Sequence, residues 1–503
     1  MDHPFSTDTS LTSEHFRAQM SDEDKSFADE IEQLLSDHRS QSKTVLKEAH
    51  LSELYDRFNT TEMSDESGTL SNYASILKHD ILPHVVNVGS EYCVGHMTSA
   101  LPRFQAEISR LVSLLNQNVV KIETSRVLTL IERQSIGMLH RLAFSQSDDF
   151  YAQHLFEPSS VLGVVTSGGT LSNITALWMA RKRLGPDELD GNEVIVASEL
   201  AHYSFRKAAS LLGLKRDPIK VPAHSNGAIN LVALEETLTE LREAGDRVLA
   251  VVGIAGTTET GAVDDLKAMA AIAKRHNTHF HVDGAWGGAL LLSNTHRNLL
   301  DGLELADTFS ICGHKQLYLP QGISILLCRD PSLGAGIRTQ AKYQARPKSL
   351  DLGMHSAEGS RPAMSLHLHA AFHVLGRRGY EELIDTSIEK ARIFAELINA
   401  HPAFELLAKP KTNLIVYRYL PEQYRTNTPA GLSEHIDRVN TWLQERQFLE
   451  GNSLISRTTL SSSEPYGRGS VVALRAVLAN PRTTAKTLQS VLEEQVMLGD
   501  MAP

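Results

Sequence analysis

The chain has 503 residues, more than one hydrophobic core usually supports, so we expect two or three domains. Its 42% hydrophobic and 22% charged residues are typical of a soluble globular protein. The formal net charge of −11 argues against nucleic acid as a partner, because contacts to phosphates need clustered Lys and Arg residues.

The cysteines and the N-terminal residues indicate a cytoplasmic protein. Cys93, Cys312 and Cys328 are too few and too scattered for a disulfide framework or a zinc site, which fits a reducing compartment. The first residues lack the basic and then apolar pattern of a signal peptide, and no apolar stretch reaches the roughly 18 residues of a membrane span. We therefore expect neither secretion nor membrane insertion.

Residues 1–110 are expected to form an N-terminal helical segment. Acidic residues after Ser21 are typical of a helix N-terminus, and apolar residues follow them at helical spacing. These apolar positions are Phe27, Ile31, Leu34 and Leu35. Such a stripe needs a partner surface, which is either the rest of the same chain or a second subunit.

Residues 111–365 are expected to form a large domain, because short β-branched runs alternate there with helical patterns. The candidate strands are 162–165, 193–197, 219–221, 248–254, 279–282, 308–312 and 322–328. The helical patterns include 171–184, 231–243 and 266–275. This order predicts an α/β domain with a mainly parallel seven-stranded sheet, whose ligand lies beyond the carboxyl ends of the strands.

Residues 366–503 are expected to form a smaller α+β domain, with strands at 414–417 and 470–478. His367, His369 and His373 cluster near its start. The spacing does not place the first two on one helix face, and no carboxylate accompanies them at a suitable distance along the chain. We therefore predict no metal site.

Lys315 stands in a short connection between two apolar runs that are predicted to be buried strands. Burial penalises the charged form of an amine, and a neutral amine can attack a carbonyl carbon. Lys315 is therefore either a nucleophile of this kind or a strand-end lysine that points at water. The residues upstream decide between these two interpretations.

Glycines and hydroxyl residues follow the first strand of the large domain, in the order Thr166, Ser167, Gly168, Gly169 and Thr170. The helix predicted after them directs its N-terminal N–H groups and dipole at the same point, where an anion such as phosphate would bind. The motifs that bind nucleoside triphosphates and dinucleotides are absent. A purely structural turn is the alternative.

Asp283 ends a later apolar strand, next to small residues that let a flat group approach. By itself it could merely cap the following turn. A phosphate cradle, a strand-end carboxylate and Lys315, in this order, together match the needs of pyridoxal 5′-phosphate: an anchor, a partner for the pyridine nitrogen and an amine for the aldehyde.

Two more polar residues follow strands at the same edge of the predicted sheet. His202 could stack on the cofactor ring, or it could be an ordinary surface histidine. In the stretch 256–265, Thr257 is the residue better placed to face a ligand, because the pair Asp264 and Asp265 is expected to cap the following helix.

The motifs at 166–170, His202, 256–258, 281–283 and 314–315, taken in this order, resemble those of the group II pyridoxal-phosphate-dependent amino-acid decarboxylases. The stretches 95–102 and 116–125 look most like the pyridoxal-dependent aspartate 1-decarboxylase family. The resemblance covers about residues 75–495. It implies the aspartate aminotransferase-like fold, also called fold type I, and a homodimer with residues from both subunits in each site.

The resemblance also implies roles for the cofactor-binding residues. Lys315 would carry the cofactor, Asp283 would pair with the pyridinium nitrogen, and His202 would stack on the ring. The residues expected around the rest of the cofactor are Ser167, Gly168, Gly169, Thr170 and His314 at the phosphate, Thr257 near the ring substituents, and Ala285 behind the ring.

Other residues are implied on the substrate side. Arg475 lies in a segment that resembles the one whose arginine binds the substrate α-carboxylate, and His96 and Thr98 lie in the stretch most similar to the aspartate 1-decarboxylases. Tyr343 is the only tyrosine of the loop-like segment 340–347. It would correspond to the family's mobile-loop tyrosine, which is implicated in protonating the product.

The function implied is decarboxylation of L-aspartate to β-alanine, which would feed pantothenate synthesis. Decarboxylation of glutamate or cysteine sulfinate is the alternative within the same group. The segment 96–102 has no glutamine of the kind that glutamate decarboxylases use for substrate recognition, which weakens glutamate. An aminotransferase or an aldehyde synthase on the same fold is a further alternative.

Overall fold

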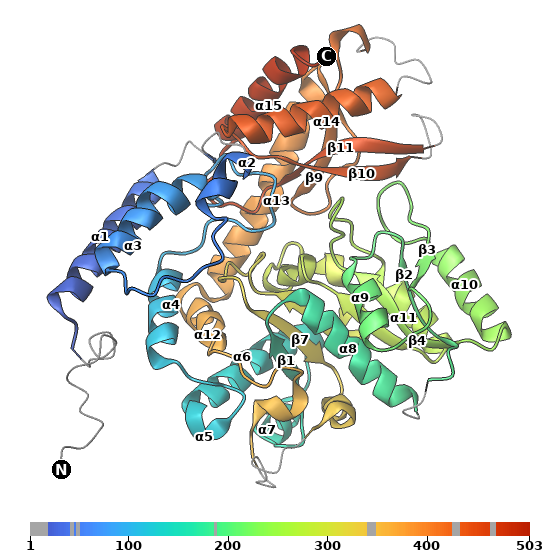
Figure 1. Ribbon diagram of the computed structural model, residues 1–503. Coiled ribbons are helices and arrows are strands. Elements are labelled where there is room, and N and C mark those ends of the chain that lie inside the picture. The colour runs from blue at the N-terminus through green and yellow to red at the C-terminus, as the bar shows by residue number, and fades with distance from the viewer. Residues whose placement is uncertain are drawn as a thin grey trace, which may run out of the picture.

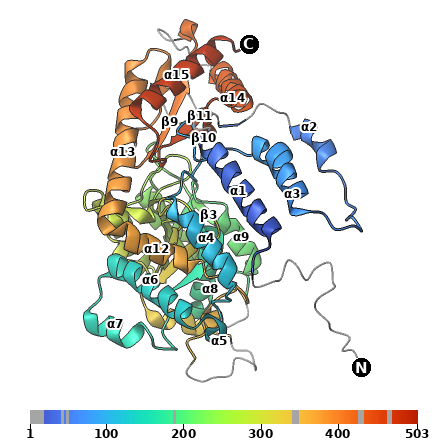
Figure 2. The ribbon, with the colours of Figure 1, turned by 90° about the vertical axis from the view of Figure 1, so that its left-hand side faces the viewer.

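The computed structural model describes residues 19–40, 45–46, 51–185, 189–339, 349–424, 433–462 and 469–503. The chain forms a lower α/β layer structure and an upper, smaller sheet covered by helices (Figure 1). The long helix α13 (Gly376–Ala400) runs from the lower part to the upper part. The three N-terminal helices lie to one side of both, as the turned view shows (Figure 2).

The large sheet has seven strands in the order β1-β7-β6-β5-β4-β2-β3. Their bounds are β1 Gly163–Thr166, β2 Glu193–Ser198, β3 Ile219–Val221, β4 Arg247–Ile254, β5 His279–Asp283, β6 Thr308–Cys312 and β7 Ser324–Cys328. Strand β7 runs antiparallel to both of its neighbours, and the other pairs are parallel. The mainly parallel seven-stranded sheet expected from the sequence is confirmed.

Helices cover both faces of this sheet, because buried side chains alternate along its strands. On β2, Val194 and Val196 face the apolar cluster that includes α6, α10 and α11, whereas Ile195 and Ala197 face the cluster of α8 and α9. The helices of this part are α4 Phe104–Leu115, α5 Ile122–Ser125, α6 Val127–Phe144, α7 Asp148–His154, α8 Gly169–Leu184, α9 Ser204–Leu211, α10 Leu231–Glu243, α11 Leu266–Arg275 and α12 Ser365–Val374.

The small sheet is antiparallel, in the order β10-β11-β9-β8. Its elements are β8 Phe404–Leu406, β9 Leu414–Tyr419, α14 Ser433–Glu450, β10 Ser456–Ser462, β11 Gly469–Val477 and α15 Ala485–Asp500. Its core also contains Val94, whose N–H donates to the carbonyl of Leu454. A stretch far upstream in the sequence is therefore part of this smaller unit.

The N-terminal helices are α1 Asp22–Ser40, α2 Leu51–Leu54 and α3 Leu70–Ile76. Helix α1 begins with Ser21 and Asp24 bonded to each other, as an N-cap requires, and it packs against α3. Of its apolar stripe, Leu34 is buried, but Leu35 stays exposed. The helix predicted after Ser21 is thus present, with part of its apolar surface uncovered in the single chain.

Candidate active site

A cavity of about 330 Å³ lies beyond the carboxyl ends of β1, β2, β4, β5 and β6. The residues that line it include Ser167, Gly168, Gly169, Thr170, His202, Asp283, Ala285, His314 and Lys315, each of which follows or ends one of these strands. Parallel strands bring their carboxyl ends to one edge of a sheet, which explains why residues far apart in sequence meet here. Nine of the ten residues expected around a cofactor therefore share one cavity.

The turn from β1 into α8 forms an anion cradle at one end of this cavity. The Thr166 hydroxyl contacts the Ser172 hydroxyl at 2.8 Å and donates to the carbonyl of Gly168, which fixes the turn before the first helical residue, Gly169. A Cβ atom added at Gly169 would lie 2.6 Å from Sγ of Cys312, so only glycine fits. The first N–H groups of α8 thus lie at the cavity, as a bound phosphate requires.

Two donors hold the Asp283 carboxylate. Nδ2 of Asn173 donates to Oδ2 at 2.9 Å, and the N–H of Ala285 donates to Oδ1 at 3.0 Å. The Ser310 hydroxyl lies 3.4 Å from Oδ1 but donates to the nearer oxygen of Asn173, at 2.9 Å. Because the two groups that bind it donate, Asp283 is oriented as an acceptor, which is the role that a protonated ring nitrogen would need.

His202, His314 and Lys315 complete the cavity. The N–H of Ser204 donates to Nδ1 of His202, so that the Nε2 atom is left to carry the proton of the neutral ring. Burial lowers the pKa of His202, although the Asp283 carboxylate opposes this effect. Burial and the Lys315 cation lower the pKa of His314, whose buried Nδ1 has no partner among the described residues.

Thr257 does not line the cavity. Its hydroxyl contacts that of Thr260 at 2.9 Å and accepts from the N–H of Ala262, while Gly256 and Thr258 line the cavity on either side of it. A one-residue difference along the turn decides which side chain faces the ligand. The role expected for Thr257 near the ring is untested.

The expected substrate residues lie beside the cavity instead of lining it. Nη1 of Arg475 donates to the carbonyl of Thr258, which lines the cavity, and Nε donates to the Ser456 hydroxyl. Nδ1 of His96 lies 2.6 Å from the Thr98 hydroxyl. Partial burial and then the Arg475 cation lower the pKa of His96. Tyr343 lies outside the described residues.

Sequence reasoning gave no role to Asn173, although this residue stands three positions after the glycine motif 166–170. It stands four residues into α8, is fully buried, and reaches Asp283 across the sheet. A buried amide on the face of a helix that begins at an anion site was the available signal. Its partner, 110 positions away, could not be read from the motif.

The histidines at 367, 369 and 373 lie in the described part of the chain, outside the cavity. No group of three or more His, Cys, Asp and Glu residues there could hold a metal ion. His367 is hydrogen-bonded to Gln105, and the rings of His369 and His373 are tilted toward each other with centroids 4.1 Å apart. No helix in the described part of the chain is both long enough and apolar enough to span a membrane.

The residues present fit pyridoxal phosphate. The helix N-terminus and hydroxyls suit its phosphate, the oriented Asp283 suits its ring nitrogen, and Lys315, whose amine has no partner among the described residues, suits its aldehyde. Together with the mainly parallel sheet, they define a pyridoxal-phosphate-dependent enzyme of fold type I.

Comparisons with known proteins narrow this class. The pyridoxal-dependent decarboxylase conserved domain matches residues 19–420, and the chain belongs to that family. An aspartate 1-decarboxylase of Aliivibrio fischeri is 41% identical, over 94% of this chain and 90% of the relative. An L-2,4-diaminobutyrate decarboxylase of Rhizobium meliloti is 30% identical, over 82% and 78%.

The solved structures agree with this assignment. The crystal structure of mouse CSAD in apo form superimposes with a TM-score of 0.84, at 26% identity, over 94% of this chain and 98% of that one. The chain is therefore a pyridoxal-phosphate-dependent amino-acid decarboxylase, which confirms the cofactor, the fold and the class of enzyme expected from its motifs.

Proposed function

We propose that this decarboxylase removes the α-carboxylate of L-aspartate to give β-alanine and carbon dioxide, and that it feeds pantothenate synthesis in the cytoplasm. The single observation that carries the proposal is the 41% identity, over nearly the whole chain, to an aspartate 1-decarboxylase. The site agrees with an acidic substrate, because an arginine lies beside a cavity that already contains a lysine.

The residues of the cavity are proposed to have different roles toward the cofactor. Lys315 would hold the cofactor through its aldehyde, and Ser167, Gly168, Gly169, Thr170 and His314 would hold its phosphate. The bound cofactor serves as an electron sink when the bond between Cα and the carboxylate breaks. Asp283 keeps a proton on the ring nitrogen, and His202 and Ala285 hold the ring from its two faces.

Arg475 is proposed to bind the substrate α-carboxylate, as the resemblance of its segment implies. Two of its nitrogens are fixed by Thr258 and Ser456, whereas Nη2 makes no hydrogen bond to any described residue. A guanidinium held in this way has a donor ready for a carboxylate without further ordering of its side chain. His96 and Thr98 lie next to it and would contact the same end of the substrate.

To identify the substrate, purified protein is loaded with pyridoxal phosphate. It is then incubated with an equimolar mixture of L-aspartate, L-glutamate, cysteine sulfinate and L-2,4-diaminobutyrate. β-Alanine should dominate the products, and the variant Lys315→Ala should form none. Dominance of γ-aminobutyrate, hypotaurine or 1,3-diaminopropane would reject aspartate and keep the decarboxylase. Carbon dioxide without keto acid or aldehyde excludes the aminotransferase and the aldehyde synthase.

The protein is further proposed to be a homodimer. Apolar side chains of the N-terminal helices, including Leu35, Tyr73 and Ile76, are exposed in the single chain. These helices stand away from the body of the molecule (Figure 2). A second subunit would cover them, which favours residues 1–110 as a dimer-embracing segment beside the domains 111–365 and 366–503. Mass measurement by light scattering, with and without residues 1–68, tests this arrangement.

Tyr343 is proposed to give the proton that Cα takes up after decarboxylation. The support is its place as the only tyrosine in the segment 340–347, together with the resemblance to the family loop. The variant Tyr343→Phe should still bind the cofactor and lose product formation. Unchanged formation of product would assign the proton to another group.

A further inference from the structure

A buried chain of hydrogen bonds leads away from Asp283 into the core of the large domain. The Asn173 amide donates to the carboxylate, and its oxygen lies 3.1 Å from Nε2 of His281. Nδ1 of His281 lies 3.0 Å from the Thr308 hydroxyl, which lies 2.8 Å from Nε2 of His279. Asn173, His281 and Thr308 are at most 1% exposed.

The chemistry of each group fixes the direction in which the hydrogen bonds of this chain run. An ionised carboxylate only accepts, so Asn173 turns its NH₂ group to Asp283 and its oxygen to His281. That oxygen accepts from the Ser310 hydroxyl at 2.9 Å. Because an amide oxygen can only accept, its contact with His281 also places the ring proton of His281 on Nε2. Burial lowers the pKa of His281, so the ring is neutral near pH 7 and its Nδ1 accepts the single hydroxyl proton of Thr308. The Thr308 hydroxyl has no second proton to donate, so its oxygen accepts from Nε2 of His279.

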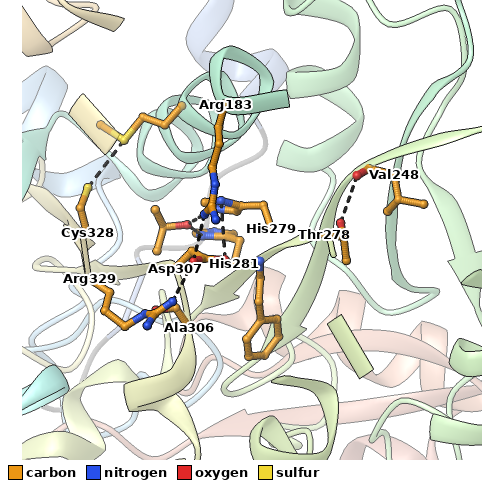
Figure 3. A network of polar contacts seen from close by, with 12 residues as sticks. Arg183, Val248, Thr278, His279, His281, Ala306, Asp307, Cys328 and Arg329 are labelled. Carbon is orange, nitrogen blue, oxygen red and sulfur yellow. Dashed lines mark hydrogen bonds and ion pairs between the residues drawn. The ribbon is translucent and has the colours of Figure 1, made fainter. Parts of the chain in front are cut away.

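Charged residues anchor the far end of this hydrogen-bond chain, where the inner strands β5 and β6 begin (Figure 3). Asp307 accepts from the N–H of Phe280, between the two histidines, and pairs with Arg183 at 3.2 Å and Arg329 at 3.0 Å. These contacts fix β5 against β6, so His279, His281 and Thr308 keep their register. The chain therefore rests on rigid elements at both ends.

An amide cannot relay a proton as a hydroxyl or imidazole can, so this chain does not carry protons between solvent and the cofactor. It instead adds aligned dipoles whose positive ends point at Asp283. Aligned hydrogen bonds polarise one another in a medium of low dielectric constant. Their effect is to favour a negative charge on the carboxylate.

We propose that His281, acting through Asn173 and set by the Thr308 hydroxyl, is a positioning residue that fixes Asp283 as an anion and so keeps the cofactor ring nitrogen protonated. The inference rests on the proposed role of Asp283. It assigns a function to Asn173, which lines the cavity, and to the buried His281 and Thr308, which are not among the residues that line it.

The test uses nitrogen NMR of the full-length protein loaded with pyridoxal phosphate that is isotopically labelled at the ring nitrogen. Thr308→Val removes the hydroxyl with little change of shape, and His281→Leu removes the donor to Asn173. Both should move the nitrogen signal toward the unprotonated position and weaken cofactor binding about ten-fold. His281→Gln, which offers an N–H and an oxygen in similar places, should restore the wild-type signal.

The control Thr175→Val removes another buried hydroxyl, which only donates to the carbonyl of Leu171 within α8. It should leave the nitrogen signal and cofactor affinity unchanged. Thermal melting of each apoprotein establishes whether the variants are folded. If His281→Leu does not fold, Thr308→Val alone tests the inference.

Asp283→Asn separates failure of this inference from failure of the proposed role of Asp283. A protonated ring nitrogen in Asp283→Asn would reject the proposed role of Asp283, and with it the proposed role of the hydrogen-bond chain. Suppose instead that the ring nitrogen loses its proton in Asp283→Asn but keeps the wild-type signal in Thr308→Val and His281→Leu. That result would reject only the role of the hydrogen-bond chain and keep the role of Asp283.

Discussion

Sγ of Cys312 fills the space beside Gly169, so that a Cβ atom at position 169 would lie 2.6 Å from it. These two residues join the first turn of α8 to the end of β6, which carries Lys315 three residues later. The contact therefore sets how closely the anion cradle approaches the lysine. It also makes the cradle intolerant of a single methyl group.

Gly169→Ala is expected to weaken binding of pyridoxal phosphate by at least about ten-fold, because the helix or β6 must shift to admit the methyl group. Cys312→Ala removes the obstructing sulfur, so the double variant should recover part of the affinity. Titration of each apoprotein with the cofactor, followed by absorbance, measures this coupling. Equal losses in Gly169→Ala with and without Cys312→Ala would show that the contact is not the cause.

The neighbouring glycine offers a contrast in stability. A Cβ at Gly168 meets nothing within 4 Å, and the backbone there is extended. Gly168→Ala should therefore leave the melting temperature of the apoprotein unchanged, whereas Gly169→Ala should lower it. A similar loss in both variants would mean that the turn, and not the sulfur, restricts position 169.

Arg475→Lys is expected to raise KM for the substrate about 10-fold to 100-fold, because a lysine cannot keep the contacts to Thr258 and Ser456 and also offer a donor to a carboxylate. Cofactor affinity should stay as it is. Arg457→Lys, on the neighbouring strand β10 and paired with the exposed Glu445, is the matched control. An unchanged KM in Arg475→Lys would place the substrate carboxylate elsewhere.

The sequence predicts the large sheet well, since its strands are short apolar runs separated by clear helical patterns. The bounds predicted for α10 and α11 are those observed, Leu231–Glu243 and Leu266–Arg275. Strand β10 was not predicted, because Ser456–Ser462 is polar and lacks an alternating pattern. Its pairing with β11 alone shows it as a strand.

The candidate site was likewise predictable from the sequence only in part. Residues at strand ends were predictable, because parallel strands bring all their carboxyl ends together. The partners of those residues were not predictable: Asn173 reaches Asp283 only after folding, and Thr258 rather than Thr257 lines the cavity because of the local turn. Tertiary contacts of this kind have no period in the sequence.

Burial lowers the pKa of the buried histidines His279 and His281. It also lowers the pKa of His140 and His367 from 6.5 to about 4, so stability should fall between pH 6.5 and pH 4. In this window the unfolded chain binds protons that the native protein does not. His140 and His367 therefore each contribute a loss of about 3 kcal/mol on going from above pH 6.5 to pH 4. Urea unfolding at several pH values measures the slope.

His140→Gln isolates one of these groups. The neutral ring bonds the Tyr151 hydroxyl and the carbonyl of Cys328, and a glutamine can make both bonds without titrating. The free energy of unfolding of this variant should fall less steeply below pH 6.5, by about one proton per molecule. An identical slope in the two proteins would show that His140 takes up a proton in the native state.

Glu132→Gln should lower the free energy of unfolding by about 3 kcal/mol, because it leaves the buried Arg361 cation with only the more distant Glu358, 3.9 Å from Nε, as a counter-ion. The two side chains are 1% and 2% exposed and form paired bonds of 2.8 Å and 2.5 Å. Glu107→Gln breaks an exposed pair with Arg110 and should cost less than about 0.5 kcal/mol. Equal costs in the two variants, measured by urea unfolding, would mean that water reaches the Arg361 guanidinium and screens its charge.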